Sequence, residues 1–158
     1  MAKLYLSLGS NEGDREMLLR AAIDAIDLLI GPVDGISPFI ETEPWGFESK
    51  HPFLNIALSV ETDLPAMDVL DRTQEIERQL GRQRKSVAGQ YEDRPIDIDL
   101  LCYDDLVLST ERLTLPHPLL QERLFVLDPL AEIAPQFLHP TLGKTIQTLR
   151  DELRLRLD

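Results

Sequence analysis

The chain has 158 residues, enough for one domain whose core needs neither disulfides nor a structural metal. Its formal net charge of -12 argues against extended binding to DNA or RNA, because a basic face supplies most of the affinity for nucleic acids. No stretch approaches the roughly 20 apolar residues of a membrane span, and the apolar run at the N-terminus is too short for a signal peptide. We therefore expect a single cytoplasmic domain, residues 1–158, without membrane or nucleic-acid partners.

The spacing of apolar residues predicts alternating strands and helices. Apolar residues at every second position indicate strands, and apolar residues three and four apart indicate helices. Pro65 suits the first turn of a second helix, and Gly81 suits its end. The expected elements are a strand at 3–9, a helix from Asp14 to about Leu29, strands at Ile36–Thr42 and Phe53–Glu61, a helix from Pro65 to Leu80, a strand at Ile96–Leu100 and a last helix from Thr145 to about Leu157.

Between these elements the sequence predicts loops and short pieces. Residues 43–52, rich in proline, form a loop, Leu106–Leu108 is a short extended piece, and Pro116–Pro135 is irregular with short helical pieces. The resulting order, β-α-β-β-α-β, is typical of a ferredoxin-like α+β fold. In that fold an antiparallel sheet carries two helices on one face, and here a C-terminal helical extension follows.

The strand at Ile96–Leu100 carries two carboxylates among apolar residues. Because side chains alternate along a strand, Asp97 and Asp99 point to one face while Ile98 points to the other. Adjacent carboxylates repel each other unless a cation lies between them, and Mg²⁺ prefers carboxylate and phosphate oxygens. An Asp-x-Asp pair alone also fits a solvated strand edge. The cations that precede this strand favour the metal site.

Four cations lie between the second helix and this strand, namely Arg82, Arg84, Lys85 and Arg94. With two acids, Glu92 and Asp93, they leave a local charge of +2 on an acidic protein, which suits a small anion better than a polymer. Charge runs of this kind also occur as solubilising loops. Arginines can however bind a polyphosphate through bidentate contacts. We further expect residues 82–94 to be mobile when empty and to close over substrates.

Other residues are candidates for binding a small molecule. Phe53 and Asn55 share one face of their strand, where a flat heterocycle could stack on the ring and bind the amide. They are equally compatible with ordinary surface residues. His117, between two prolines, is either a loop residue or a phosphate donor. A stripe along the second helix leads toward the arginines and consists of Leu70, Gln74 and Glu77.

Taken together, these motifs resemble the 6-hydroxymethyl-7,8-dihydropterin pyrophosphokinase family over almost the whole chain. The most specific is Arg94-x-Ile96-Asp97-Ile98-Asp99 followed by Leu113-Thr114-Leu115-Pro116-His117-Pro118. The others are Leu8-Gly9-Ser10-Asn11, Phe53-Leu54-Asn55, Glu77 with Gly81-Arg82-x-Arg84-Lys85, and Arg123-x-Phe125-Val126-Leu127-x-Pro129-Leu130. The resemblance implies a ferredoxin-like enzyme of folate biosynthesis. Such an enzyme transfers pyrophosphate from ATP to the hydroxymethyl group of 6-hydroxymethyl-7,8-dihydropterin and releases AMP.

The resemblance also implies roles for the candidate residues. Asp97 and Asp99 would hold two Mg²⁺ ions together with the ATP phosphates, and Arg82 and Arg94 would stabilise charge on the transferring group. ATP would be bound by Leu70, Gln74, Glu77, Arg84, Lys85, Arg112, Leu113, Thr114, His117 and, at the rim, Arg123. The pterin would be bound by Phe53 and Phe125, which stack on it, and by Thr42, Trp45 and Asn55 at its edge. We expect a monomer with small-molecule substrates.

The chain departs from the family pattern at two places. Many relatives have an aromatic residue and Gly-Pro before the arginine of the Asp strand, whereas this chain has Tyr91-Glu92-Asp93 there. Two acids beside a phosphate-binding arginine could soften ATP binding or change loop closure. An aromatic residue that often follows the Pro-His is here Pro118. Neither departure affects the aspartate pair.

Two other functions are compatible with the sequence. A non-catalytic ferredoxin-like module that binds a small ligand would need neither Asp97 nor Asp99, and its nucleotide binding would not depend on Mg²⁺. A metal-dependent phosphohydrolase would use the same carboxylates with water as the acceptor, so it would consume ATP without a pterin. The net charge of -12 disfavours a third possibility, an RNA-binding sheet.

Overall fold

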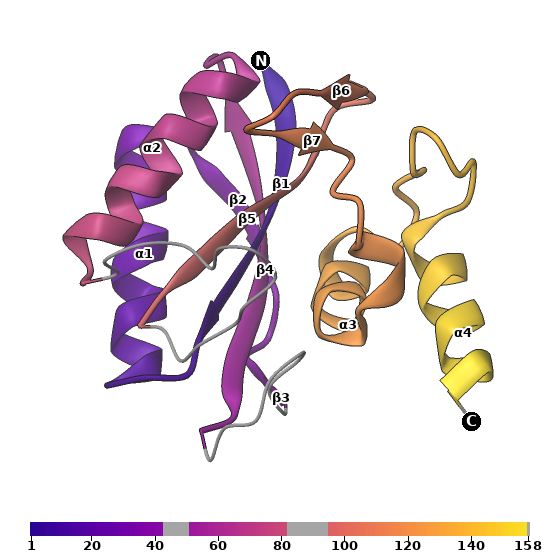
Figure 1. Ribbon diagram of the computed structural model, residues 1–158, viewed down its shortest axis with the longest axis horizontal. Coiled ribbons are helices and arrows are strands. Elements are labelled where there is room, and N and C mark those ends of the chain that lie inside the picture. Colours follow the sequence, from indigo (N-terminus) through magenta and orange to yellow (C-terminus); the bar gives the residue numbers. More distant parts are fainter. Residues whose placement is uncertain (43–50, 82–94, 158) are drawn as a thin grey trace.

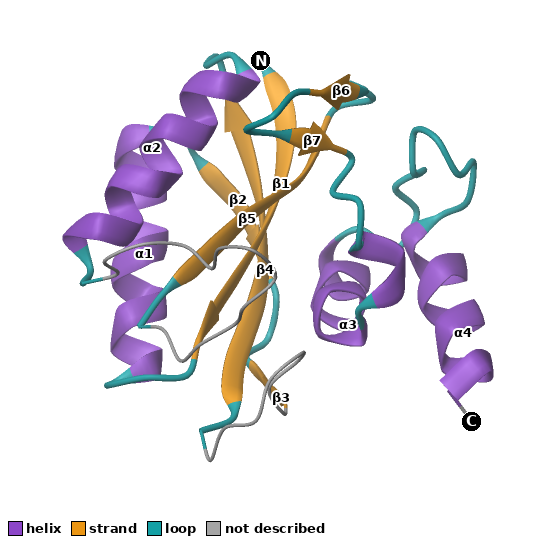
Figure 2. Cartoon of the chain, viewed as in Figure 1, coloured by secondary structure: helices purple, strands orange, loops and turns teal. Residues whose placement is uncertain are grey.

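The computed structural model describes residues 1–42, 51–81 and 95–157. The elements of these ranges are β1 (Ala2–Ser10), α1 (Arg15–Leu29), β2 (Val33–Ile36), β3 (Ile40–Thr42), β4 (Phe53–Thr62), α2 (Ala66–Gln79), β5 (Asp97–Tyr103), β6 (Leu108–Ser109), β7 (Thr114–Leu115), a 3-10 turn (Leu120–Glu122), α3 (Leu124–Ile133) and α4 (Ile146–Leu157). They form three layers, in which the central sheet lies between α1 and α2 on one face and α3 and α4 on the other (Figures 1 and 2).

The sheet has the strand order β2-β4-β1-β5, and β3 is a further partner of β4. All of these neighbouring strands are antiparallel. Helix α1 connects β1 to β2, and α2 connects β4 to β5, so each helix crosses over one intervening strand, as in a split βαβ fold. The predicted ferredoxin-like α+β fold is thereby confirmed. Among the described residues none of the helices has both the length and the apolar character needed to cross a membrane.

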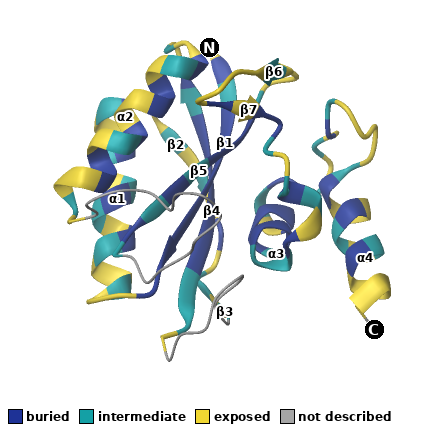
Figure 3. Cartoon of the chain, in the orientation of Figure 1, coloured by how far each residue is buried: buried dark blue, intermediate teal, exposed yellow. Residues whose placement is uncertain are grey.

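The core under α1 and α2 follows the alternation seen in the sequence. Leu6 of β1, Ile56 and Leu58 of β4 and Ile98 of β5 are all buried and pack in one cluster with the apolar faces of both helices (Figure 3). Burial of these side chains supplies most of the stabilisation of the sheet against the helices. The strand alternation predicted from the sequence is therefore confirmed on this face.

The ends of the first two helices lie within one residue of their predicted positions. Asp14 caps α1 by accepting a hydrogen bond from the backbone N–H of Met17 at 3.1 Å. Pro65 precedes α2, and Gly81 follows it with a φ of +105°, a conformation that favours glycine.

The C-terminal extension forms a second core on the opposite face of the sheet. Tyr5 and Ala57 of the sheet cluster with Leu127 and Leu130 of α3 and with Leu149 of α4. The Tyr5 ring also contacts a ring from the α3–α4 connection, that of Phe137, at a centroid distance of 4.8 Å. The extension is thus an integral layer of the molecule, and it brings α3 against β4.

A β-bulge in β5 contributes to this second core. The register between β1 and β5 shifts by one residue between Tyr5 and Leu6, so two successive residues, Leu101 and Cys102, pack in the second cluster. Burial raises the pKa of the Cys102 thiol to about 12. Cys102 is therefore a neutral packing residue, as expected for a lone cysteine after an apolar run.

Two predicted segments differ from the structure. The single strand expected at Ile36–Thr42 is divided into β2 and β3, because Pro38 has no N–H to donate to the sheet. Ser37 keeps the contact with β4 there, since its hydroxyl oxygen accepts a hydrogen bond from the N–H of Ala57 at 2.8 Å. The irregular region expected at Pro116–Pro135 contains the ten-residue helix α3. Its apolar residues on all sides and its internal proline hide the helical period.

The piece expected at Leu106–Leu108 is also different in detail. The strand β6 begins at Leu108 and pairs with β7, which the sequence did not predict, to form a hairpin that contacts β5. The two-residue strands are too short to show alternation. This hairpin forms one wall of the site described next.

Candidate active site

The register of the sheet places predicted site residues in rows across β5, β1 and β4. Gly9 of β1 is paired with Asp97 on one side and with Asn55 on the other. One pair further along, Ser7 is paired with Asp99. Paired residues point to the same face of a sheet, and here that face is opposite to α1 and α2. The carboxylate pair and Asn55 therefore lie on one face of the sheet.

The side chains of the two aspartates are partly exposed to solvent, as they must be to bind an ion from solution. Asp97 and Asp99 are half-buried, whereas Ile96 and Ile98 are buried in the core on the other side of the strand. The prediction that the two carboxylates share one face is confirmed. Among the described residues no group of three or more His, Cys, Asp or Glu side chains could hold a metal ion. Two carboxylates fit a hard cation that takes its remaining ligands from phosphate oxygens and water.

A buried glutamate supports the strand that carries the aspartates. Glu77 of α2 is 2% exposed, and its Oε2 accepts a hydrogen bond from the backbone N–H of Ile98 at 2.8 Å. Ile98 lies between the two aspartates, so this bond fixes the strand where the carboxylates project. The sequence assigned Glu77 to the nucleotide, but the structure adds a contact inside the protein that periodicity alone did not indicate.

A cavity of about 230 Å³ opens beside the aspartates, between α2, β5 and the hairpin. It is lined mainly by residues that the sequence assigned to ATP and metal, namely Leu70, Gln74, Asp99, Arg112, Leu113, Thr114 and His117. These residues come from four separate segments of the chain. The structure therefore brings together most of the described residues of the predicted nucleotide set.

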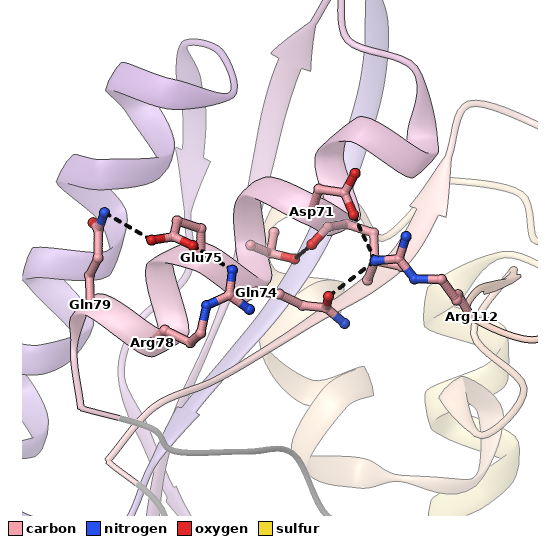
Figure 4. Close-up of polar contacts among 8 residues, drawn as sticks. Asp71, Gln74, Glu75, Arg78, Gln79 and Arg112 are labelled. Carbon is pink, nitrogen blue, oxygen red and sulfur yellow. Dashed lines mark hydrogen bonds and ion pairs between the residues drawn. The ribbon is translucent and has the colours of Figure 1, made fainter.

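Arg112 is held across this cavity by α2 (Figure 4). Its Nη2 donates to Asp71 Oδ1 at 2.6 Å and to Gln74 Oε1 at 3.2 Å. The Arg112 and Asp71 side chains are each at least half exposed, so water screens the ion pair and limits its contribution to stability. The contacts nevertheless direct the guanidinium toward a wall of the cavity. Asp71 is a residue that sequence reasoning missed, although its position three residues before Gln74 places it on the same side of α2.

The backbone and the ring of His117 are fixed by its neighbours. Its N–H donates to the carbonyl oxygen of Leu101 at 2.9 Å, which attaches the segment to β5. Its Nδ1 accepts a hydrogen bond from the N–H of Leu119 at 3.1 Å. The peptide bond between Leu115 and Pro116, just before it, is cis. The two hydrogen bonds give His117 a defined orientation at the cavity wall.

The candidate pterin residues lie on β3 and β4, on the same face as the aspartates. The Asn55 amide Nδ2 donates to Thr42 Oγ1 at 2.6 Å, and Thr42 is paired with Phe53 in the ladder. Asn55 is 3% exposed, so it is not the ordinary surface residue of the alternative interpretation. A Cβ atom added to Gly9 would lie 2.9 Å from Asn55 Oδ1 and 3.3 Å from Phe53 Cδ1. The glycine leaves the space that these two side chains occupy.

Two further candidates lie at the start of α3, namely Phe125 of the pterin set and Arg123 of the ATP set. Phe125 packs against the second core, and α3 contacts both β3 and β4, so Phe125 and Phe53 lie on the same side of the sheet. Arg123, expected at the rim, is 8% exposed, with its Cζ 5.5 Å from the centroid of the Phe125 ring. A buried position replaces the expected rim position because the start of α3 packs onto the sheet.

The other predicted site residues lie outside the described residues. They are Trp45, Arg82, Arg84, Lys85 and Arg94. The departure at Tyr91-Glu92-Asp93 and the expected closure of residues 82–94 lie outside them too. These expectations stay predictions.

Comparison with known proteins gives a family match and several close relatives. The model of the family described as 7,8-dihydro-6-hydroxymethylpterin-pyrophosphokinase (HPPK) matches residues 5–135. A protein of Porphyromonas gingivalis, named 2-amino-4-hydroxy-6-hydroxymethyldihydropteridine pyrophosphokinase, is 50% identical over 141 residues, which are 89% of this chain and 95% of that protein. Proteins of the same name from Aquifex aeolicus and Bacillus subtilis are 37% and 43% identical, over 99% and 84% of this chain and 95% and 78% of their own lengths.

Solved structures give the same fold. A crystal structure of Plasmodium falciparum HPPK-DHPS matches 99% of this chain with a TM-score of 0.80 at 16% sequence identity. This chain spans 45% of that longer chain, so the match concerns only that part of it. At this level of identity the likeness establishes the fold alone.

Proposed function

The chain belongs to the 7,8-dihydro-6-hydroxymethylpterin-pyrophosphokinase family, and we propose how its own residues divide the work of that enzyme. The reaction moves the β,γ-pyrophosphoryl group of ATP to the hydroxymethyl group of 6-hydroxymethyl-7,8-dihydropterin, in folate biosynthesis. A bond forms between the hydroxymethyl oxygen and the β-phosphorus, and the hydroxymethyl proton is released to solvent. The bond from that phosphorus to the α,β-bridging oxygen breaks, and AMP leaves with that oxygen.

One observation supports the division, namely that the aspartate pair lies between the cavity beside α2 and the row of residues that leads to Asn55. Asp99 lines the cavity beside α2 and the hairpin. Asp97 is in the row that continues through Gly9 to Asn55. A transferring group between a nucleotide in the cavity and an acceptor over β4 would therefore pass the two carboxylates.

The acceptor side consists of Phe53 and Asn55, supported by Thr42. The Phe53 ring offers a flat apolar surface for one face of the pterin, and Phe125 on α3 would cover its other face. Asn55 carries both a carbonyl oxygen and an amide, which match the alternating donors and acceptors of a pterin edge. Trp45 completes this group in the proposal. Such pairing fixes the hydroxymethyl oxygen in place before the reaction, which is how positioning lowers the barrier.

The donor side consists of the cavity and the arginines that follow α2. Leu70 and Leu113 give apolar walls for the adenine and ribose, while Gln74 and Thr114 offer hydrogen bonds. Cationic side chains would bind the phosphates, and in this proposal they are Arg82, Arg84, Lys85, Arg94, Arg112 and Arg123. His117 would donate a further hydrogen bond to the phosphates, and Glu77 would lie beside the nucleotide. Arginine suits this role because its planar fork matches phosphate oxygens.

Asp97 and Asp99 would hold Mg²⁺, and we propose two ions. When bound, Mg²⁺ neutralises charge on the phosphates and so favours transfer. The protein's part is to present both carboxylates on one face of β5, where the described residues offer no further group of carboxylate, histidine or cysteine ligands. The half-buried position of both side chains and the bond from Ile98 to Glu77 support this assignment.

The first experiment measures AMP formed from ATP and Mg²⁺ with and without 6-hydroxymethyl-7,8-dihydropterin. We expect AMP only when the pterin is present. Loss of ATP without the pterin would instead support a phosphohydrolase. Pterin binding without any AMP would support a non-catalytic binding module.

The same assay tests the aspartates. Asp97→Ala and Asp99→Ala should each reduce turnover to background while leaving the far-UV circular dichroism spectrum and the melting temperature near those of the wild type. Asp105→Ala, which changes an exposed carboxylate in the turn after β5, serves as a control for loss of negative charge near this strand. A variant of either site aspartate that keeps near-normal turnover removes the metal assignment.

A further inference from the structure

Arg15 connects the first turn of α1 to both sides of the acceptor region. Its Nη1 donates to the carbonyl oxygen of Pro52 at 2.9 Å, and its Nη2 donates to Glu41 Oε2 at 2.9 Å. Pro52 immediately precedes Phe53 at the start of β4, and Glu41 immediately precedes Thr42 at the end of β3. A single guanidinium thus binds the two strand ends that carry the candidate pterin residues.

These contacts lie behind the acceptor region and not in it. In the ladder, Thr42 is paired with Phe53 and Glu41 with Leu54, so Glu41 and Leu54 point to the face opposite to Phe53. Leu54 packs against the core under α1 and α2, which confirms that this is the helix face. Arg15 reaches Glu41 from that face. It therefore cannot touch a pterin that stacks on Phe53 from the other face.

The strand ends need such support because the local pairing is short. Within the described residues β3 has three residues, its pairing partner is β4, and the pair of Thr42 with Phe53 is the outermost one described. Pairs of a short edge strand open more easily than central ones. Beside this end lies a cavity of about 400 Å³, lined by Asn11, Arg15 and Pro52 among others, so the space next to the Arg15 contacts is only partly filled by the described side chains.

Asn11 gives a second link across the same cavity. Its Nδ2 donates to the carbonyl oxygen of His51 at 3.1 Å, and the Asn11 side chain is buried, with 2% of the residue exposed. The turn after β1 and the start of α1 therefore contact two successive carbonyls, those of His51 and Pro52, just before Phe53. The two links have the same effect, which is to fix the direction in which β4 begins.

We propose that Arg15 is a positioning residue for pterin binding. It fixes the ends of β3 and β4 relative to each other, and so holds Thr42, Phe53 and Asn55 in the arrangement that accepts the pterin. This inference rests on the proposed function, because it takes these three residues as the pterin side. Arginine is required because its fork reaches a carbonyl and a carboxylate at once, which a lysine ammonium does not reproduce.

Steady-state kinetics of Arg15→Met test the proposal, with the full chain, ATP, Mg²⁺ and the pterin. The KM for the pterin should rise roughly threefold to tenfold, the range expected for loss of charged hydrogen bonds that are partly exposed. The KM for ATP and kcat should stay within about twofold, since the nucleotide cavity lies on other elements. Arg15→Lys should fall between the wild type and Arg15→Met. Glu41→Gln, which keeps an acceptor oxygen, should have a smaller effect than Glu41→Ala.

Arg72→Met is the matched control. Arg72 also donates from its guanidinium to a backbone carbonyl of a neighbouring element, that of Leu29 at 3.2 Å, but at the other end of α1. It should leave the KM for the pterin unchanged. An unchanged pterin KM in Arg15→Met overturns the proposal. A parallel rise in both KM values with a lower melting temperature overturns it too, because Arg15 would then be merely structural.

Phe53→Ala separates failure of this inference from failure of the proposed function. If Phe53→Ala raises the pterin KM and Arg15→Met does not, the pterin side stands and only the role of Arg15 is lost. If Phe53→Ala has no effect on the pterin KM, the assignment of the acceptor side itself is wrong, and the role of Arg15 falls with it.

Discussion

At the scale of single residues, the site depends on Gly9 having no Cβ atom. Gly9 lies between Asp97 and Asn55 in the sheet, and it is the position over which the side chains of Phe53 and Asn55 lie. Any side chain there would have to displace the Asn55 carbonyl oxygen, which is part of a buried amide bonded to Thr42. The glycine is therefore required by space and not by backbone conformation.

Gly9→Ala should weaken pterin binding. A methyl group would meet Asn55 Oδ1 at 2.9 Å and the Phe53 ring at 3.3 Å, so both side chains must move. Overpacking of this kind costs about 1–3 kcal/mol, so the KM for the pterin should rise on the order of tenfold. Kinetics with each substrate varied in turn measure this. A variant in which only the KM for ATP rises would contradict the prediction.

At the scale of elements, the aspartate strand is attached to α2 by one buried carboxylate. The bond from the Ile98 N–H to Glu77 satisfies a backbone donor at the start of β5, where Ile98 is already paired with Leu8 of β1. A buried donor that loses its acceptor is costly, more so than an average hydrogen bond is favourable. Glu77 thus has a structural task whether or not it also contacts the nucleotide.

Glu77→Ala should lower the free energy of unfolding by about 1–3 kcal/mol without any nucleotide present, because the Ile98 N–H is then left buried and unsatisfied. Glu77→Gln keeps an acceptor oxygen and should retain more of the stability. Denaturant unfolding of the three proteins gives the comparison. Glu75→Ala on the exposed side of the same helix should change stability little, since Glu75 pairs only with neighbouring residues of α2. Equal losses at both positions would contradict the assignment.

The connection between α3 and α4 is organised by a histidine. His139 is 3% exposed, and its Nδ1 accepts hydrogen bonds from the N–H groups of Thr141 and Leu142 at 3.3 and 3.0 Å. Burial lowers the pKa of His139 below its ordinary value of 6.5. The neutral ring is therefore the form that the folded state holds.

His139 should make the protein less stable as the pH falls below about 6.5. The unfolded chain takes up a proton on this histidine near that pH, while the folded chain resists protonation until its lower pKa is reached. The contribution of His139 to stability is therefore lost between about pH 6.5 and its lower folded-state pKa, and it does not change further below that pKa. We expect the difference in unfolding free energy between pH 7.5 and pH 5.5 to be smaller in His139→Gln than in the wild type. The other histidines are common to both proteins, so an identical difference would show that His139 does not titrate in this way.

At the scale of the whole molecule, negative charge exceeds positive charge by a wide margin. The chain has 28 acidic and 16 basic residues, so each basic side chain could be paired and a net charge of -12 would still remain. Uncompensated like charges repel one another in the compact state. Local cations, Arg112 among them, therefore lie in a generally negative environment.

Salt should stabilise the protein. Raising NaCl from about 10 mM to 150 mM shortens the distance over which charges act from roughly 30 Å to 8 Å, which screens long-range repulsion more than close ion pairs. We expect the melting temperature to rise by roughly 2–4 °C, which corresponds to about 1 kcal/mol for a chain of this size. Thermal melts in NaCl and in KCl at equal ionic strength measure it. A falling melting temperature would mean that ion pairs outweigh net repulsion.

The sequence alone determined the β-α-β-β-α-β order of the main unit, the ferredoxin-like class and the faces of its strands. These properties depend on local spacing. Ile96, Ile98 and Leu100 could therefore be assigned to the core, and Asp97 and Asp99 to the other face, before any contact was known. The family motifs also predicted a set of nucleotide residues, and two of them, Gln74 and His117, line one cavity with Asp99. Each of these inferences concerns residues that are close in the chain or that a motif connects.

Only the tertiary structure decided what depends on contacts between distant segments. The second core required α3 to lie on the sheet, which its uniform apolar composition and Pro129 concealed. Three supporting contacts join distant residues. Glu77 and Ile98 are 21 positions apart, and Arg112 and Asp71 are 41 apart. Arg15 is 26 positions from Glu41 and 37 from Pro52. The spacing of apolar residues records which side of an element is buried, but not which partner covers it. For that reason the chemistry of the site could be predicted from the sequence, and its supporting contacts could not.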